Sequence, residues 1–166
     1  NDEPMGRKML VQETGLGEGS LRTILDKLDE YGLVKSARAG RALTDEGKKV
    51  FQRIKQIVRI EKIGALEMTA AQNNCLVLVN NGGDNVRPGM DQRDAAIKIG
   101  RSGATTLVVE KGKLIMPGFD EKINMDKNYP DESEKIKKRL DPEEGDAIVI
   151  GSEDNPQAAE EAAWVA

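Results

Sequence analysis

The strongest constraint on the fold is a helical pattern between two glycine-containing turns near the start of the chain. In "GEGSLRTILDKLDEYGLVKS", residues 17–36, apolar side chains recur with the 3.6-residue period of a helix that is apolar on one face. These side chains are Leu21, Ile24, Leu25 and Leu28, and Leu33 continues the apolar surface. The turn and cap before the helix are predicted at Gly17, Gly19 and Ser20. Gly32 is its predicted end.

Further elements are predicted on both sides of this helix. A short helix over "RKMLVQET" ends at Gly15, and only "LGEG" separates the two helical patterns, which is the spacing of a helix-turn-helix. After Gly32, "LVKSARAGRALT" predicts two short strands around the basic tip "RAGR". Thr44 is then the predicted N-cap of a helix over "TDEGKKVFQRIKQIVRI". Its apolar residues are Val50, Phe51, Ile54, Ile57 and Val58.

This part of the chain resembles the archaeal and bacterial winged-helix transcription regulators. "GEGSLRTILDKLDEYGLV" looks like the recognition helix of that family, and "RALTDEGKKVF" looks like its wing strand followed by the "LT-x-x-G" start of the next helix. The resemblance covers residues 6–58 and implies a winged helix-turn-helix. The first helix of the family is missing, and we expect that natural residues precede Asn1.

The polar face of the predicted recognition helix is the candidate DNA-binding surface. Arg22 and Thr23 lie in its first turn, where such helices reach base edges in the major groove. The basic residues of the predicted hairpin, which would be the wing, are expected to contact phosphates. The residues expected to contact double-stranded DNA are Ser20, Arg22, Thr23, Lys27, Lys35, Arg38 and Arg41. The alternative is a face that meets only water or another protein. Asp26, Asp29 and Glu30 favour this alternative because their carboxylates repel phosphate.

The charge distribution divides the chain into two parts. Residues 1–63 carry 13 Lys and Arg against 10 Asp and Glu, a balance of +3, and residues 64–166 carry 12 against 19, a balance of −7. A weakly basic front half beside an acidic rear half fits a nucleic-acid module joined to a second domain. No apolar run approaches the length of a membrane span, and the start has no signal-peptide core, so we expect a cytoplasmic protein with no membrane partner.

The sequence offers few groups for metal or covalent chemistry. It contains no histidine and one cysteine, Cys75, which lies in an apolar run and is expected to be buried. We therefore expect no cofactor, no metal site and no catalytic residue. The competing enzyme hypothesis uses Asp84, Asp91, Asp94 and Asp146 to hold magnesium at a phosphate site. In that alternative the winged helix is a protein-contact module attached to a nucleotide- or phosphate-handling enzyme domain.

The domain boundary is predicted where "IEKIGALEM" loses helical spacing. Residues 1–62 form the winged-helix domain with its linker helix, and residues 63–166 form an α+β regulatory or dimerisation domain. The apolar seam of the helix after Thr44 exceeds what a small three-helix core needs, and a homodimer follows from pairing two such seams. Packing of the seam entirely within one chain is the alternative.

The second half predicts strand, helix, strand, strand, helix, strand and helix in that order. The corresponding segments are "NCLVLVNN", "MDQRDAAIKIG", "ATTLVVEKGKLIMPG" with a turn at Lys111-Gly112, "DESEKIKKRL", "GDAIVIGS" and "NPQAAEEAAWVA". This order fits an α+β ferredoxin-like split βαβ sandwich. The segments "QRDAAIKIG" and "GATTLVVEKGKLIMPG" are also similar to the C-terminal domain, of unknown function, of an archaeal winged-helix family.

The densest polar cluster of this half is "GGDNVRPGMDQRDAAIKIGRSGATT". Its glycines, Gly89 among them, permit close backbone approach, and the helix that follows offers free N–H groups to a small anionic effector. The candidate ligand-binding residues are Gly82, Gly83, Arg87, Gln92, Arg93, Asp94, Thr105 and Thr106. The alternative is that the glycines only form turns and that Arg93 and Asp94 form ordinary ion pairs. The sequence thus predicts a DNA-binding transcription regulator with a dimerising, effector-sensing second domain.

Overall fold

The computed structural model describes residues 3–69, 71–87, 90–118 and 120–166. The chain divides into two compact units, Asn1–Gln56 and Ile57–Ala166. The division lies before the expected boundary at residues 62 and 63, because the segment expected to link the domains is a strand of the second unit. In the described residues, no helix combines the length and the apolar character that crossing a bilayer needs.

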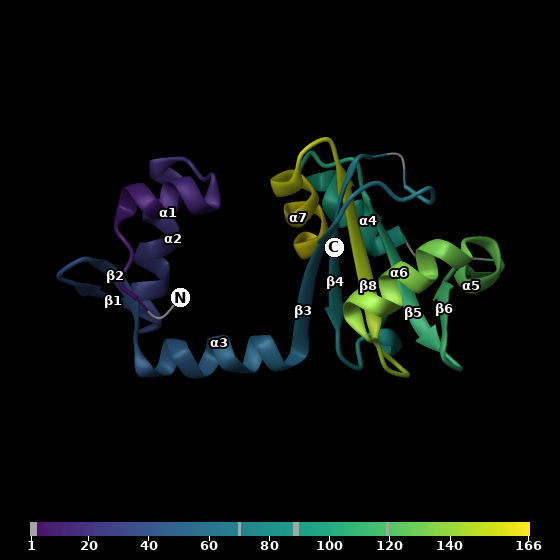
Figure 1. Ribbon diagram of the computed structural model, residues 1–166. Coiled ribbons are helices and arrows are strands. Elements are labelled where there is room, and N and C mark those ends of the chain that lie inside the picture. The colour runs from purple at the N-terminus through teal and green to yellow at the C-terminus, as the bar shows by residue number, and fades with distance from the viewer. Residues whose placement is uncertain (1–2, 70, 88–89, 119) are drawn as a thin grey trace. The chain divides into compact units, whose positions relative to one another are not determined.

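The first unit has two helices, a hairpin and a third helix, in the predicted order. They are α1 (Arg7–Thr14), α2 (Glu18–Glu30), β1 (Val34–Ala37), β2 (Gly40–Leu43) and α3 (Asp45–Ile57), which runs to the division (Figure 1). Gly15 ends α1 with a φ of 65°, and the hydroxyl of Thr44 caps α3 by accepting the Gly47 N–H at 3.0 Å. A backbone bridge between Met5 and Arg41 adds a third extended segment to the hairpin.

Helix α2 begins earlier than its sequence pattern indicates. Gly17 is the N-cap and Glu18 the first helical residue, so Gly19 and Ser20 lie inside the first turn instead of before it. No side chain caps this end. The glutamate in the first turn is favourable there because the helix dipole places partial positive charge at the N-terminus.

The apolar stripe of α2 is only partly covered. Leu21 and Leu25 are buried, whereas Ile24 is 42% exposed. The reason is geometric: within the first unit α2 packs against α1 and β1, and this contact is narrower than the stripe.

The second unit is a six-stranded sheet covered by helices. Its elements are β3 (Val58–Ile63), β4 (Asn73–Val79), η1 (Gly83–Asn85), α4 (Met90–Lys98), β5 (Ala104–Glu110), β6 (Lys113–Met116), β7 (Ile123–Asn124), α5 (Met125–Asn128), α6 (Pro130–Leu140), β8 (Ala147–Glu153) and α7 (Pro156–Val165). The predicted strands and helices of this half are present, together with β3, β7, η1 and α5, which the sequence patterns did not indicate. Val58 begins β3 and does not belong to the seam of α3.

The strand order differs from that of a ferredoxin-like sandwich. The sheet runs β3-β4-β8-β5-β6-β7, and every pairing between these described strands is antiparallel. A split βαβ unit requires a central parallel pair, which here would join β4 to β6. Instead β8 lies between β4 and β5. The coarse α+β class is therefore right and the ferredoxin-like topology is wrong, because pairing between distant strands is not encoded in the order of elements.

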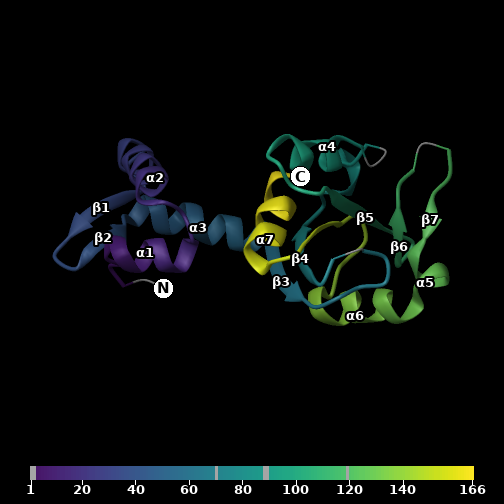
Figure 2. The ribbon, with the colours of Figure 1, turned by 90° about the horizontal axis from the view of Figure 1, so that it is seen from above.

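The two faces of this sheet carry different cores. Helix α6 covers one face and α4 and α7 cover the other (Figure 2). Long aliphatic side chains of the strands pack with Ile136 and Leu140 beneath α6. On the other face, Ala159 and Ala163 of α7 pack against small and β-branched residues. Gly151 permits this close approach, since an added Cβ would lie 2.1 Å from the carbonyl oxygen of Ala159.

Candidate functional site

The residues predicted to contact DNA lie on α2 and on the hairpin of the first unit. Four of them are exposed on α2, namely Ser20, Arg22, Thr23 and Lys27. Lys35 on β1 and Arg38 in the hairpin turn are exposed as well. The hydroxyl of Thr23 donates to the carbonyl oxygen of Gly19 at 3.2 Å, so its oxygen retains lone pairs that face solvent. The six side chains are thus available to a partner.

Arg41 differs from these six residues. Its guanidinium forms an ion pair with the carboxylate of Asp29, and its second terminal nitrogen lies 4.0 Å from a carboxylate oxygen of Asp26. Its backbone forms both hydrogen bonds of the bridge to Met5. The side chain is only 24% exposed. Arg41 therefore ties the hairpin to the later turns of α2 and does not project from the tip.

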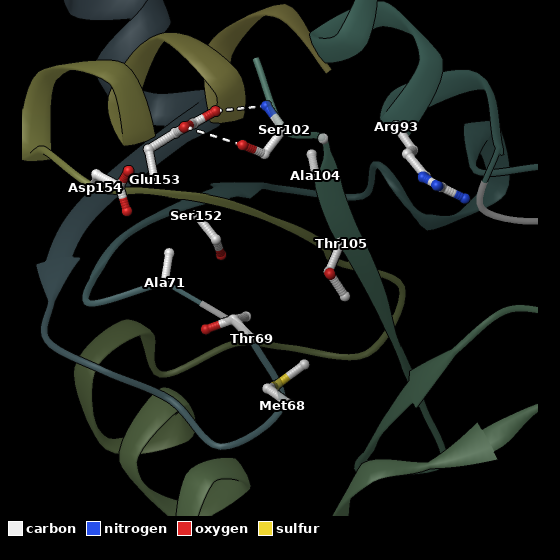
Figure 3. A pocket seen from close by; sticks show the side chains of 11 residues that line it. Met68, Thr69, Ala71, Arg93, Ser102, Ala104, Thr105, Ser152, Glu153 and Asp154 are labelled. Atoms are coloured by element: carbon white, nitrogen blue, oxygen red, sulfur yellow. Dashed lines mark hydrogen bonds between the residues drawn. The ribbon is translucent and has the colours of Figure 1, made fainter.

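A polar pocket of about 620 Å³ lies in the second unit, where β5 begins and β8 ends. Figure 3 shows side chains from α4, from the ends of both strands and from the segment that precedes β4 around it. The lining residues are Met68, Thr69, Ala71, Arg93, Ser102, Gly103, Ala104, Thr105, Ser152, Glu153 and Asp154. This volume lies within the range of small-molecule sites.

One wall of the pocket is fixed by a buried asparagine, Asn74, which is 2% exposed. Its amide nitrogen donates to the carbonyl oxygens of Gly64 at 2.8 Å and Ala71 at 3.4 Å. Its amide oxygen accepts the hydroxyls of Thr69 at 2.9 Å and Ser152 at 2.5 Å. The four bonds hold the segment that precedes β4 against the end of β8 and fix two hydroxyl groups that line the pocket.

The charged groups of the pocket come from separate elements. The Glu153 carboxylate accepts the backbone N–H of Ser102 at 2.6 Å and its hydroxyl at 3.1 Å (Figure 3). Asp154 is exposed, and its backbone carbonyl accepts from Asn73 at 2.8 Å, on the β4 side. Arg93 of α4 lies on the β5 side, where its Cγ would be 3.3 Å from a Cβ added to Gly103. A glycine at this position, with a φ of 131°, leaves room for the arginine stem.

Comparisons with known proteins identify the family. A family model described as a domain of unknown function (DUF4443) matches residues 70–166, which is more than half of the chain. The chain belongs to the DUF4443 family. A second model, described as the PH0730-like N-terminal domain, matches residues 1–49.

A solved structure supports this assignment over nearly the whole chain. The hypothetical protein PH0730 from the archaeon Pyrococcus horikoshii OT3 is similar with 30% sequence identity and a TM-score of 0.71. The match covers 97% of this chain and 81% of the Pyrococcus chain. Among curated proteins no match was found. The resemblance to an archaeal family of unknown function is thus confirmed, and no activity comes with it.

Two of the predicted ligand-binding residues of the DUF4443 domain lie in the pocket. Arg93 and Thr105 line it. Among the described residues, six others do not line it: Gly82, Gly83, Arg87, Gln92, Asp94 and Thr106. Gly89 lies outside the described residues.

The predicted residues that do not line the pocket pack locally, project from the opposite face of the sheet or are exposed. An added Cβ at Gly83 would lie 2.7 Å from the carbonyl oxygen of Gly145 and from a methyl carbon of Val108, so this glycine permits close packing against the turn before β8 and against β5. Thr106 is adjacent to Thr105 on β5 and therefore projects from the opposite face of the sheet, where its buried hydroxyl has no partner in the described structure. Arg87 and Asp94 are exposed.

Most of the pocket was not predictable from a local motif. Thr69, Ser152 and Asp154 belong to segments more than 80 residues apart that meet only because β4 and β8 are neighbours. The sequence signal at this point was the polar "GSED" run at the end of a buried strand.

The aspartates of the enzyme hypothesis and Cys75 do not form a reactive cluster in the described residues. Asp146 is buried, and its carboxylate accepts the backbone N–H groups of Asn81 and Glu143, each at 2.9 Å. In the described ranges, no three His, Cys, Asp or Glu residues come together as metal ligands. Cys75 is buried as predicted, and burial raises the pKa of its thiol to about 11.

Proposed function

We propose that this protein is a DNA-binding transcription regulator whose first unit is a winged helix-turn-helix. The order α1, α2, hairpin and α3, with the Met5 segment paired to β2, is the arrangement of that motif. In it α2 is the recognition helix. Arg22 then reads bases from the first turns of α2, and Lys35 and Arg38 of the hairpin contact phosphates.

The observation that carries this proposal is the pairing of Arg41 with Asp29 and Asp26. The acids on the later turns of α2 are the strongest argument against DNA binding, because carboxylates repel phosphates. Arg41 offsets part of their charge from within the same unit, because it pairs with Asp29 and lies close to Asp26. Arg22, Lys35 and Arg38 stay exposed, so the surface formed by α2 and the hairpin retains cations that no described carboxylate neutralises.

The test is a fluorescence anisotropy titration of the full chain against labelled duplexes. One duplex carries the promoter region of its own gene and the other has a random sequence, each at low and at moderate salt. We expect salt-sensitive binding to both and tighter binding to the promoter. Absence of binding to either duplex at low salt would overturn the proposal.

The proposed regulator acts as a homodimer formed through α3. Phe51, Ile54 and Ile57 are each at least 44% exposed on one side of this helix. Their helix carries Asp45 and Glu46 in its first turn, followed by two lysines, and Lys55 in its last turn. An antiparallel pair around a two-fold axis would bury the apolar residues and place the acidic start of each helix beside the basic end of the other. We therefore infer that a second copy of this chain covers Phe51, Ile54 and Ile57 of α3.

Analytical ultracentrifugation tests the dimer. We expect the Ile54→Glu variant to sediment as a monomer and the Gln52→Glu variant, which changes an exposed polar position of the same helix, to remain a dimer. A monomeric wild-type chain at high micromolar concentration would contradict the proposed pairing.

A further inference from the structure

The hydrogen-bonding polarity of the pocket in the second unit follows from the orientation of Asn74. A carbonyl oxygen can only accept, so the nitrogen of this amide must be the atom that faces the carbonyls of Gly64 and Ala71. The amide oxygen consequently faces the hydroxyls of Thr69 and Ser152 and accepts from them. This assignment does not depend on seeing hydrogen atoms.

Both of these hydroxyl groups therefore use their single hydrogen inside the protein. Ser152 donates to Asn74, and the other acceptor within reach of the Thr69 hydroxyl is the carbonyl oxygen of Leu66 at 3.2 Å. Towards the pocket, each oxygen presents only lone pairs. Together with the exposed carboxylate of Asp154, they form a side that accepts hydrogen bonds and carries negative charge. Such a side matches an ammonium group.

The other side of the pocket has the reverse polarity. The guanidinium of Arg93 has five N–H donors and no acceptor, and it has no ion-pair partner in the part of the chain that the structure describes. The hydroxyl of Thr105 likewise has no partner among the described residues, so its hydrogen is available. Figure 3 shows these two side chains opposite Asp154, with Ser152 between them. A guanidinium is the donor that best matches a carboxylate, and the Thr105 hydroxyl is a separate donor that Figure 3 shows apart from it.

We propose that this pocket binds an L-α-amino acid as a zwitterion. The ammonium group is held by Thr69, Ser152 and Asp154, and the carboxylate is held by the guanidinium of Arg93. The volume of about 620 Å³ leaves space for the amino-acid side chain near Met68. The purely anionic effector that the sequence predicts is disfavoured, because it would face Asp154 and Glu153. In the proposed regulator this ligand is the effector, but its binding does not require DNA.

The test measures ligand binding to the full chain without DNA. Each of the standard L-amino acids is added at millimolar concentration, and thermal unfolding is followed, since a ligand of the folded state raises the midpoint. Calorimetry then gives Kd for the best compound. Its analogue without the amino group and its amide without the carboxylate should each bind at least about tenfold more weakly, the loss expected for one charged hydrogen-bonding partner.

Variants assign the two ends of the ligand. Asp154→Asn and Arg93→Gln should each raise Kd about tenfold or more. The controls Asp131→Asn and Lys98→Gln, which alter an exposed acid and an exposed base outside the pocket, should leave Kd unchanged. The proposal is overturned if no amino acid shifts the midpoint, or if the deaminated analogue binds as tightly as the amino acid. Neither outcome depends on DNA binding, so failure here is distinct from failure of the proposed regulator.

Discussion

Arg41 on β2 and Asp29 on α2 form an ion pair that connects the hairpin of the first unit to its second helix. Arg41 also lies within 4.0 Å of Asp26, one helical turn earlier. Removal of the guanidinium would leave two unbalanced carboxylates on the helix that we propose to read DNA. In the proposed complex Arg41 would therefore affect the affinity for phosphates through these two acids, without contacting the phosphates itself.

We predict that Arg41→Gln weakens DNA binding in the wild-type background by about 1 kcal/mol, through its effect on Asp29. In an Asp26→Asn, Asp29→Asn background the same change should have a much smaller effect. Anisotropy titrations of the four proteins give this coupling. An equal loss in both backgrounds would show that Arg41 contacts DNA directly.

Arg22 should determine base preference. Arg22→Ala removes an exposed side chain from the first turns of α2, and an arginine bidentate to guanine is worth about 1–3 kcal/mol of discrimination. We expect the variant to retain binding to random duplex and to lose part of its preference for the promoter. Unchanged discrimination by Arg22→Ala would mean that α2 does not read the groove in this orientation.

Gly151→Ala should destabilise the second unit. Its new Cβ would lie 2.1 Å from the Ala159 carbonyl oxygen, so α7 must shift, at a cost of about 2 kcal/mol. Trp164, the only tryptophan, lies on α7 and reports urea unfolding of this unit by its fluorescence. Gly64→Ala is the matched control, because nothing lies within 4 Å of its added Cβ. Equal midpoints for the two variants would contradict the close packing of α7.

The hairpin of β5 and β6 should show a pH-dependent contribution from Glu144. Its carboxylate accepts the backbone N–H groups of Gly112 and Lys111, at 3.0 and 2.8 Å, and these bonds lower its pKa below the ordinary value of 4.5. A depressed folded-state pKa contributes stability that is present above pH 4.5 and is lost as the pH falls through the folded pKa.

Glu144→Gln should therefore lower the urea midpoint at pH 7, and the gap to wild type should narrow as the pH falls below 4.5. Glu134→Gln, at an exposed position of α6, controls for loss of one surface charge. A gap that stays constant across this range would show that the charge of Glu144 does not strengthen the turn.

The sequence predicted elements with a strong local signal and missed features that depend on distant pairing. Helix α2, the hairpin turn at Lys111-Gly112 and the cap at Thr44 all follow from residues within one or two turns. Strand β3 was missed because Val58 continues the apolar spacing of α3. The position of β8 between β4 and β5 arises from tertiary packing, which no local period records.

In the candidate site, too, the residues with a local sequence signal were predicted and those brought in by distant strand pairing were missed. Arg93 and Thr105 were predicted because they lie in one polar stretch of sequence, and they do lie in one pocket. Ser152 and Asp154 were missed because they meet that stretch only across the sheet. Thr106 does not line this pocket, since adjacent residues of a strand face opposite sides of the sheet.

The salt dependence of DNA binding tests the central claim most directly. The wild-type chain and the Lys27→Gln, Lys35→Gln, Arg38→Gln variant are titrated with one duplex over a range of salt concentrations. We predict that log K falls linearly with log salt for the wild type, and that the variant has a slope shallower by about 0.9 for each phosphate contact removed. Identical slopes for the two proteins would contradict the proposal that α2 and the hairpin form the DNA-binding surface.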